Sequence, residues 1–152
     1  AQTRMARVIA VADFANISVD RGLIPQTTLS DVLRSLLQRR LPAGWRVIAG
    51  DNVRAAVRTL GYTQDDLVYP SRVAAVARAL GADWVVTGTW TQLRVISTST
   101  IADVQIRVLE ASSRQRLLEG RFRGEAPGGD LGSLLLAATE ALRDVASRIA
   151  RL

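Results

Sequence analysis

Apolar side chains recur at two different spacings along this chain, and the spacing changes at Gly81. From Pro70 to Leu80 they recur every three or four residues, which predicts an amphipathic helix with proline at its first position. Gly81 can adopt the left-handed conformation that ends a helix. Trp84 then begins a β-rich run, so this segment predicts a helix, a glycine stop and a strand in succession.

The same two spacings divide the rest of the chain into predicted strands and helices. Strands are expected at residues 7–14, 45–49, 84–94, 101–109 and 114–124. Helices are expected from residue 28 to a stop at Pro42, and at residues 51–60, 70–80 and 130–152. The order βαβααβββα predicts an α/β (α+β) fold with a single mixed sheet of about five strands and helices mainly on one face. We expect one domain over residues 1–152.

Side chains that can cap a helix mark the predicted helix starts. They are Thr28 with Asp31, then Asp51, then Thr63 with Asp66 before a short turn, and Asp130. Residues 15–26 are expected to form a loop, and residues 127–129 break the chain before the last helix. The Ser/Thr tract at residues 97–100 either turns a hairpin or extends the strands beside it, because β-branched Thr suits a strand.

Two helices carry a continuous apolar face, which predicts that they pack on the sheet. In the first helix this face comprises Leu29, Val32, Leu33, Leu36 and Leu37, with Arg34, Gln38, Arg39 and Arg40 elsewhere. In the last helix it comprises Leu131, Leu134, Leu135, Ala138, Leu142, Val145, Ile149 and Leu152. Residues 7–14 are apolar almost throughout, as in a strand covered on both faces.

The three C-terminal strands alternate apolar and polar side chains, which predicts one buried face and one open face. The open face is rich in Thr and Arg. From it we take six candidate partner-binding residues: Thr89, Thr91, Gln105, Arg107, Arg121 and Arg123. A solvated face without a partner is the alternative interpretation. Reversing the charge of the three arginines together is expected to leave the fold intact, because surface changes usually cost little.

Three residue types that carry catalytic or metal-binding chemistry are absent. All 20 basic residues are Arg, and the chain has no Lys, His or Cys. It therefore lacks the usual general base, the commonest transition-metal ligand, thiolates, and the lysine of Schiff bases and P-loops. A carboxylate-pair hydrolase is not excluded. The sequence favours a protein that is not an enzyme, has no cofactor and binds no metal.

The first residues, Ala1-Gln2-Thr3, are compatible with a chain start left by signal-peptidase cleavage, although a chain trimmed there would read the same. No stretch approaches the roughly 20 apolar residues of a membrane span. We expect an exported protein, periplasmic or extracellular, with no transmembrane segment and no lipid anchor. Cytoplasmic localisation is the alternative.

Three segments resemble the TolB amino-terminal domain family. They are VIAVADFANIS at residues 8–18, ALGADWVVTGTW at residues 79–90 and ADVQIRVLEASSRQRLLEGRF at residues 102–122. The Gly-Ala-Asp segment is the most specific of them, and the resemblance covers nearly the whole chain in the right order. The envelope modules CsgG and LpoB are related to this family in fold.

The resemblance implies a fold like that of the anticodon-binding domain, and a non-catalytic module that contacts other proteins in the bacterial envelope. Assembly into a homo-oligomer stays open. TolB continues into a β-propeller, whereas this chain stops at Leu152, and the lipidated Cys of CsgG and LpoB has no counterpart here. The connection at residues 95–101 is too short for membrane-spanning hairpins, so a pore is not expected.

Other functional interpretations rest on single features. The net charge of +6 and the anticodon-binding-like fold favour an RNA-binding or other nucleic-acid-binding protein, but the arginines are dispersed and aromatic residues make up only 5%. A sensor of a ligand or of peptidoglycan is a third class. Asp13 and Asn16 follow a strand end, where ligands bind in α/β sheets, although such side chains more often satisfy loop backbone. Trp84 and Trp90 offer an aromatic platform or, as we favour, belong to the core.

Overall fold

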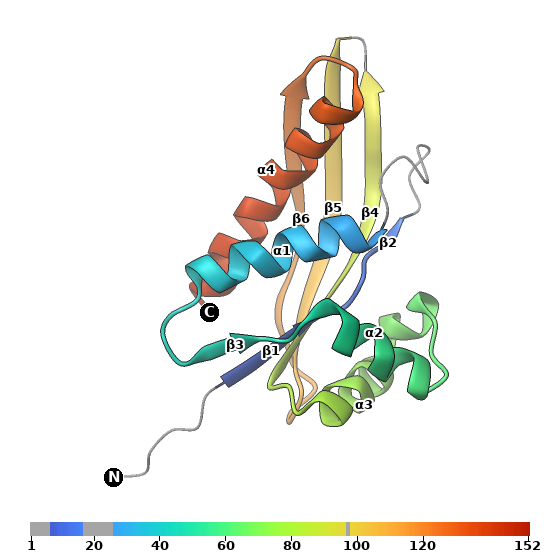
Figure 1. Cartoon of the computed structure of the whole chain (residues 1–152), viewed down its shortest axis with the longest axis vertical. Coiled ribbons are helices and arrows are strands. Elements are labelled where there is room, and N and C mark those ends of the chain that lie inside the picture. The colour runs from blue at the N-terminus through green and yellow to red at the C-terminus, as the bar shows by residue number, and fades with distance from the viewer. Residues whose placement is uncertain (1–6, 17–25, 97) are drawn as a thin grey trace.

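One mixed sheet carries the helices in the computed structural model, which describes residues 7–16, 26–96 and 98–152 (Figure 1). The strands are β1 Arg7–Val11, β2 Ala15–Asn16, β3 Trp45–Val47, β4 Trp84–Ile96, β5 Ser99–Glu110 and β6 Arg116–Pro127. The helices are α1 Gln26–Arg40, α2 Gly50–Thr59, the 3-10 helix η1 Gln64–Val68, α3 Pro70–Leu80 and α4 Leu131–Ala150. The predicted α+β class and single mixed sheet are confirmed.

The sheet has a parallel half and an antiparallel half. Its strand order is β3-β1-β4-β5-β6, with the short β2 beside β4. β1 pairs with β3 and β4 in parallel, so helices make those connections, whereas β4, β5 and β6 pair as antiparallel hairpins. Figure 1 shows β4, β5 and β6 extending well beyond the parallel half.

Helices cover the two faces of the sheet to different extents. On one face, α1 and α4 pack on apolar side chains from both halves of the sheet, including Ile9, Val86 and Val104. On the other face, α2, η1 and α3 pack on Val85 and alternate residues of β1. The apolar residues of β1 are therefore buried on both sides, as predicted. Over most of β4, β5 and β6 the second face carries no helix among the described elements, and this leaves an open surface (Figure 1).

Several predicted boundaries are confirmed. Pro70 is the first residue of α3, and Gly81 ends it in the left-handed region with φ 67°. Thr63 and Asp66 form the predicted capping box at η1. At α4, the Asp130 side chain accepts the Ser133 N–H at 2.8 Å.

Two predicted helix caps are wrong. α1 begins at Gln26, so Thr28 lies inside the helix, and Asp31 pairs with Arg34 instead of closing a capping box. α2 has Ala49 at its N-cap, without a side-chain cap bond, and Asp51 lies in its first turn. In both helices the first residue comes before the residue that was predicted to cap it.

The predicted apolar faces of both helices are confirmed except at the ends of α4. Leu142 is fully buried and Leu135 is partly buried, but Leu131 and Leu152 are exposed because they lie at or beyond the ends of α4. In α1, Arg34 was expected away from the apolar face, yet it is buried with a relative exposure of 5%.

The structure also places the segments that join these elements. β4 reaches Ile96 and β5 starts at Ser99, so Ser99 and Thr100 of the Ser/Thr tract extend β5 and Thr98 lies in the turn before it, while residue 97 is outside the described residues. Part of the predicted loop at residues 15–26 is the strand β2, while residues 17–25 and the N-terminal Ala1-Gln2-Thr3 lie outside the described residues.

Candidate protein-docking face

The polar side of β4, β5 and β6, opposite α4, is the candidate site, which we call the open sheet face. It comprises Thr87, Thr89, Gln92, Asp103, Gln105, Arg107, Glu119, Arg121 and Arg123. The apolar residues that alternate with them on β5 are fully buried, so the predicted division into two faces is confirmed. Trp84 and Trp90 lie on the buried side, so they belong to the core and do not form an aromatic platform.

Strand register arranges the polar side chains of this face in rows across the strands. Thr89 lies opposite Gln105, and Gln105 lies opposite Arg121. In the next rows, Asp103 faces Arg123 and Arg107 faces Glu119. The register therefore brings five of the six predicted site residues into neighbouring rows on one surface.

Thr91, the sixth predicted site residue, lies in a β-bulge. The register of β4 against β5 skips it, pairing Trp90 with Val104 and Gln92 with Asp103. The Thr91 hydroxyl donates to the Asp103 carbonyl oxygen at 3.3 Å. Its side chain thus supports the hairpin backbone.

Asp103 anchors this face and was missing from the residues predicted for the site. Its side chain is 3% exposed and accepts two hydrogen bonds from Arg123, Nε to Oδ1 at 2.9 Å and Nη2 to Oδ2 at 3.1 Å. The hydrogen bond to Asp103 raises the pKa of the Arg123 guanidinium above its ordinary value. Alternation along β5 puts Asp103 on the polar side, but a single strand cannot show which arginine lies opposite it.

A second group of charges lies at the other end of the face. Glu119 accepts hydrogen bonds from Arg116 at 2.7 Å and from Arg107 at 3.1 Å. The hydrogen bond from Arg116 is the main reason that the pKa of Glu119 lies below its ordinary value. Most of the positive charge on this face is therefore paired with a carboxylate, which is unlike the continuous positive track that a nucleic-acid backbone favours.

The central row is different because its polar groups have no partners among the described residues. No side-chain hydrogen bond or ion pair engages Thr89, Gln105 or Arg121 within residues 7–16, 26–96 and 98–152, and Arg121 is exposed. This row offers a guanidinium, an amide and a hydroxyl side by side to an approaching surface.

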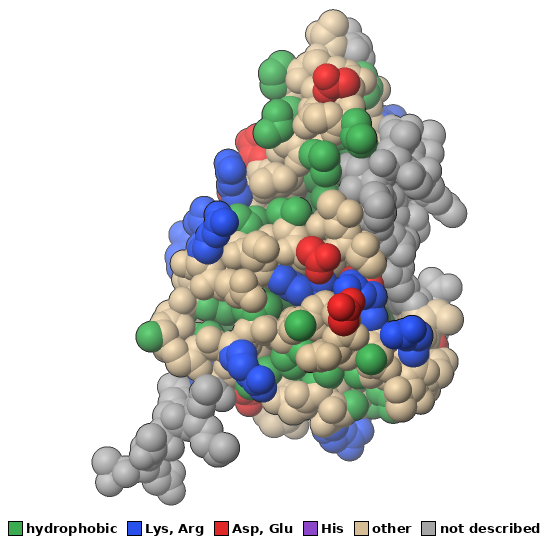
Figure 2. Space-filling view, viewed as in Figure 1, with side chains coloured by type: hydrophobic (Ala, Val, Ile, Leu, Met, Phe, Trp, Pro, Cys, Tyr) green, Lys and Arg blue, Asp and Glu red, His purple; other side chains and the backbone are tan. Residues whose placement is uncertain are grey.

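Asp13, which the sequence placed just past a strand end, belongs to a network of charges between α1 and α2. Its carboxylate lies 3.1 Å from Nη1 of Arg54 and 3.4 Å from Nη2 of Arg34. Arg34 also donates to the Val11 carbonyl and pairs with Asp31 at 2.5 Å. Figure 2 shows basic and acidic side chains meeting in this region.

The network accounts for the burial of Arg34. The guanidinium joins α1 to the end of β1, and Gly50 allows this contact, since a Cβ there would lie 2.5 Å from Nη1 of Arg34. The partners of Asp13 among the described residues are two guanidinium groups, whereas most of the loop whose backbone it was expected to satisfy, residues 17–25, lies outside them. Asn16 lies in β2, and its side chain is outside the described atoms.

The described residues form neither a metal site nor a membrane-spanning helix. No group of three or more His, Cys, Asp or Glu side chains in this part of the chain is arranged to hold a metal ion. Within the same ranges, no helix has both the length and the hydropathy needed to cross a bilayer.

Three solved structures are similar to this chain. Lipoprotein GNA1162 from Neisseria meningitidis has a TM-score of 0.66 at 18% identity, covering 96% of this chain and 99% of its own. A PelC dodecamer from Paraburkholderia phytofirmans has a TM-score of 0.58 at 15% identity, covering 98% and 90%. The LpoB C-terminal domain from Escherichia coli has a TM-score of 0.56 at 18% identity, covering 78% and 82%.

These likenesses establish the fold. No protein-family model and no curated protein matches the chain. A fold shared with LpoB is therefore confirmed, while the resemblance to the TolB amino-terminal domain stays a prediction.

Proposed function

We propose that this chain is a non-catalytic module exported to the bacterial cell envelope, where its open sheet face docks on another envelope protein. The central row of Thr89, Gln105 and Arg121, which has no side-chain partners within the described part of the chain, carries this proposal. Arginine at the centre of an interface is a frequent source of binding energy, because its guanidinium makes several directed hydrogen bonds. The similar structures support the envelope assignment, since one is named a lipoprotein and all three come from bacteria.

A photocrosslinking amino acid at Gln105 tests this assignment. We expect it to give a discrete adduct in an envelope extract of the source bacterium, because Gln105 lies beside Arg121 in the unpartnered row. The same crosslinker at Arg148, an exposed position in the last turn of α4, is the matched control. Arg121→Glu should abolish the Gln105 adduct at unchanged melting temperature.

Equal adducts at the two positions, or an adduct that survives Arg121→Glu, would contradict docking through the open sheet face.

Nucleic-acid binding is the alternative function, and the effect of salt on the affinity for RNA distinguishes it from protein docking. Phosphate contacts would weaken steeply between about 50 and 200 mM salt. With Arg107 and Arg123 paired to Glu119 and Asp103, Arg121 alone is too little positive charge for a phosphate track, and the open sheet face is expected to bind RNA only weakly.

Self-association through the apolar tip is the second part of the proposal. The apolar tip comprises Val95, Ile96, Leu131 and Leu136, which are all exposed. It lies where the β4–β5 hairpin meets the start of α4, and Figure 2 shows hydrophobic side chains gathering over this end of the molecule. One exposed leucine would be ordinary, but four exposed apolar side chains at one end of the molecule suit a contact between copies. A dodecamer among the similar structures supports a second copy of this chain as the occupant.

A further inference from the structure

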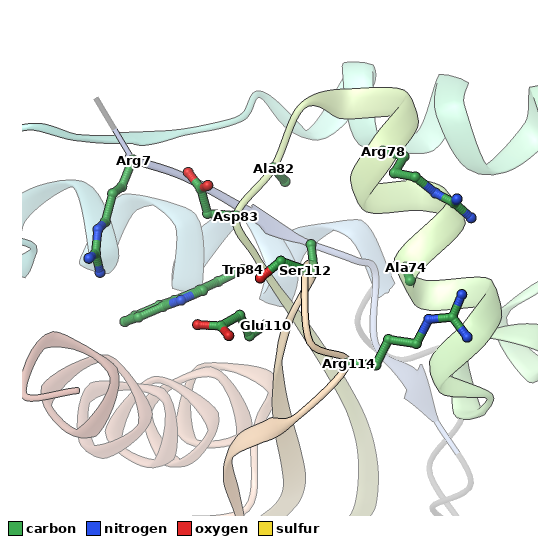
Figure 3. A pocket seen from close by; sticks show the side chains of 10 residues that line it. Arg7, Ala74, Arg78, Ala82, Asp83, Trp84, Glu110, Ser112 and Arg114 are labelled. Atoms are coloured by element: carbon green, nitrogen blue, oxygen red, sulfur yellow. The ribbon is translucent and has the colours of Figure 1, made fainter. Parts of the chain in front are cut away.

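A pocket of about 490 Å3 opens where α3 ends, β4 begins and the β5–β6 turn closes (Figure 3). Its charged lining consists of Arg7, Arg78, Asp83, Glu110 and Arg114. Trp84, Ser112 and three alanines form the rest of the wall. No residue of the open sheet face lines this pocket, so a ligand here would be separate from docking.

Both carboxylates of the pocket already accept hydrogen bonds. Asp83 Oδ2 accepts the Val8 N–H at 2.8 Å, and Glu110 Oε1 accepts the Ser113 hydroxyl at 2.7 Å. Arg7 is engaged as well, since its guanidinium lies 5.5 Å from the centre of the Trp45 ring. These groups therefore have structural partners in the absence of a ligand.

Arg78 and Arg114 differ from the other charged residues of the pocket. Neither has an ion pair or side-chain hydrogen bond within the described ranges, and both are exposed. Arg78 comes from the last turn of α3 and Arg114 from the β5–β6 turn. Figure 3 shows both guanidinium groups reaching to one side of the pocket, while the Asp83 and Glu110 carboxylates point to the other.

The backbone at Arg114 gives a second, independent observation. Its φ is 60°, and among the described residues it is the one non-glycine position with a positive φ. A turn residue in the left-handed region is usually Gly, which has no Cβ to clash there, or Asn or Asp, whose short polar side chains hydrogen-bond locally. The turn is closed by the Arg114 N–H to the Glu110 carbonyl at 2.8 Å, which glycine would also provide. Strain of this kind concentrates at functional sites.

We infer that this pocket binds a phosphate monoester, with Arg78 and Arg114 holding the phosphate. One guanidinium fork saturates the two oxygens of a single carboxylate, whereas a phosphate has enough oxygens for two forks. The pocket is much larger than one phosphate group, and its wall of Trp84 and alanines suits the organic part of the ester.

Titration with phenyl phosphate and with inorganic phosphate, at constant ionic strength, tests the assignment. We expect Arg114→Gly and Arg78→Gln each to weaken phenyl phosphate binding at least about tenfold, as losing a hydrogen bond to a charged group would. Arg114→Gly should keep or raise the melting temperature, because glycine adopts the positive φ without strain. Lost binding with retained stability would separate a ligand-holding role from a structural one.

Arg148→Gln is the matched control, since Arg148 is also an arginine in the last turn of a helix but lies outside the pocket. It should leave the affinity unchanged. If phenyl phosphate does not bind wild type, or if all three variants bind it within twofold of wild type, the phosphate site is overturned. Equal affinity for inorganic phosphate and phenyl phosphate would overturn the ester assignment.

Discussion

Arg121 and Arg123 project from the same face of β6 but have different surroundings. Arg123 makes a two-bond ion pair with the buried carboxylate of Asp103, whereas Arg121 has no partner among the described residues. The sequence alternation predicts correctly that both side chains lie on the polar side. It cannot distinguish them, because burial of Asp103 depends on what neighbouring strands place around it. The same limit explains why the burial of Arg34 was missed.

Charge reversal should therefore have unequal effects at these two positions. Arg121→Glu is expected to change the melting temperature by less than about 2 °C, as an exposed surface substitution does. Arg123→Glu should lower it by at least about 5 °C, because it places a second carboxylate against a buried one. This revises the expectation that reversal at Arg107, Arg121 and Arg123 together leaves the fold intact.

Thermal melts of the two variants at pH 7 provide the measurement. Adding Asp103→Asn to Arg123→Glu should recover part of the loss, since the amide removes the repulsion. Indistinguishable melting temperatures for the two single variants would show that the Arg123–Asp103 ion pair does not contribute to the stability of the fold.

The stability of the folded protein at acidic pH also depends on individual carboxyl groups. Hydrogen bonds from the backbone N–H and the hydroxyl of Ser133 lower the pKa of Asp130 below its ordinary value, and Asp51 and Glu119 shift in the same direction. A carboxyl group whose pKa is lower in the folded state stabilises the fold above its unfolded pKa of about 4. That stabilisation is lost as the pH falls through the folded pKa.

We expect the urea midpoint to be constant from pH 7 to about pH 5 and to fall below about pH 4. Asp130→Asn keeps an acceptor for the helix cap but does not titrate there, so its midpoint should fall less steeply between about pH 4 and pH 2. Identical pH profiles would contradict a stabilising role for the ionised Asp130 carboxylate.

At the scale of elements, α4 and β6 approach closely at Gly124. A Cβ at this position would lie 1.8 Å from the carbonyl oxygen of Ala137 and 2.8 Å from the backbone nitrogen of Ala141. The obstacle is helix backbone, which cannot rotate away as a side chain can. A glycine in a strand often marks such an approach, but the sequence does not show which helix lies there.

Gly124→Ala should therefore destabilise the protein by about 1–3 kcal/mol in urea denaturation, the usual cost of overpacking. Gly120→Ala, in the same strand, is the control because a Cβ there would meet the Phe122 ring at an ordinary 3.6 Å. It should cost less than about 0.5 kcal/mol. Equal losses would mean that the effect comes from β6 itself and not from the contact with α4.

The elements that the sequence predicts well are those with strong local signals. Pro70 and Gly81 bound α3 as expected, and Asp130 caps α4. The missed or shifted boundaries have weaker signals, since α1 begins at Gln26 and α2 at Gly50, ahead of the polar residues that seemed to start them. The short β2 consists of two residues, too few for a periodic pattern.

On the scale of the whole molecule, the two halves of the sheet were not equally predictable. Consecutive hairpins fix the order β4-β5-β6, because neighbouring antiparallel strands usually pair. The uninterrupted apolar pattern of residues 7–14 predicts a strand covered on both faces, and alternate residues of β1 are indeed buried in the apolar cores on the two sides of the sheet. That β3 forms the sheet edge depends on helix packing, and no feature of residues 45–49 indicates it.

Assembly is the prediction that belongs to this scale. If the apolar tip joins copies of the chain, the wild type should have a mass above that of the monomer in light scattering after size-exclusion chromatography. Leu131→Glu with Leu136→Glu should give the monomer at the same concentration, at little cost in stability because both side chains are exposed.

Ser35→Glu with Gln38→Glu, on exposed positions of α1 away from the tip, is the control because it adds the same two negative charges. A wild type that is monomeric at about 100 μM, or a control pair that also dissociates the assembly, would count against the apolar tip as the contact.

The bulge at Thr91 also determines which single-residue deletions β4 can accept. Because pairing skips this residue, removing it would leave an uninterrupted ladder in which Gln92, Leu93 and Arg94 keep their partners on β5. Removing Thr89 instead would move each residue between it and the bulge by one place and turn Trp90 outward. Insertions and deletions among relatives of this chain should therefore collect at Thr91, where the strand length can change without exchanging the inside and the outside of the sheet.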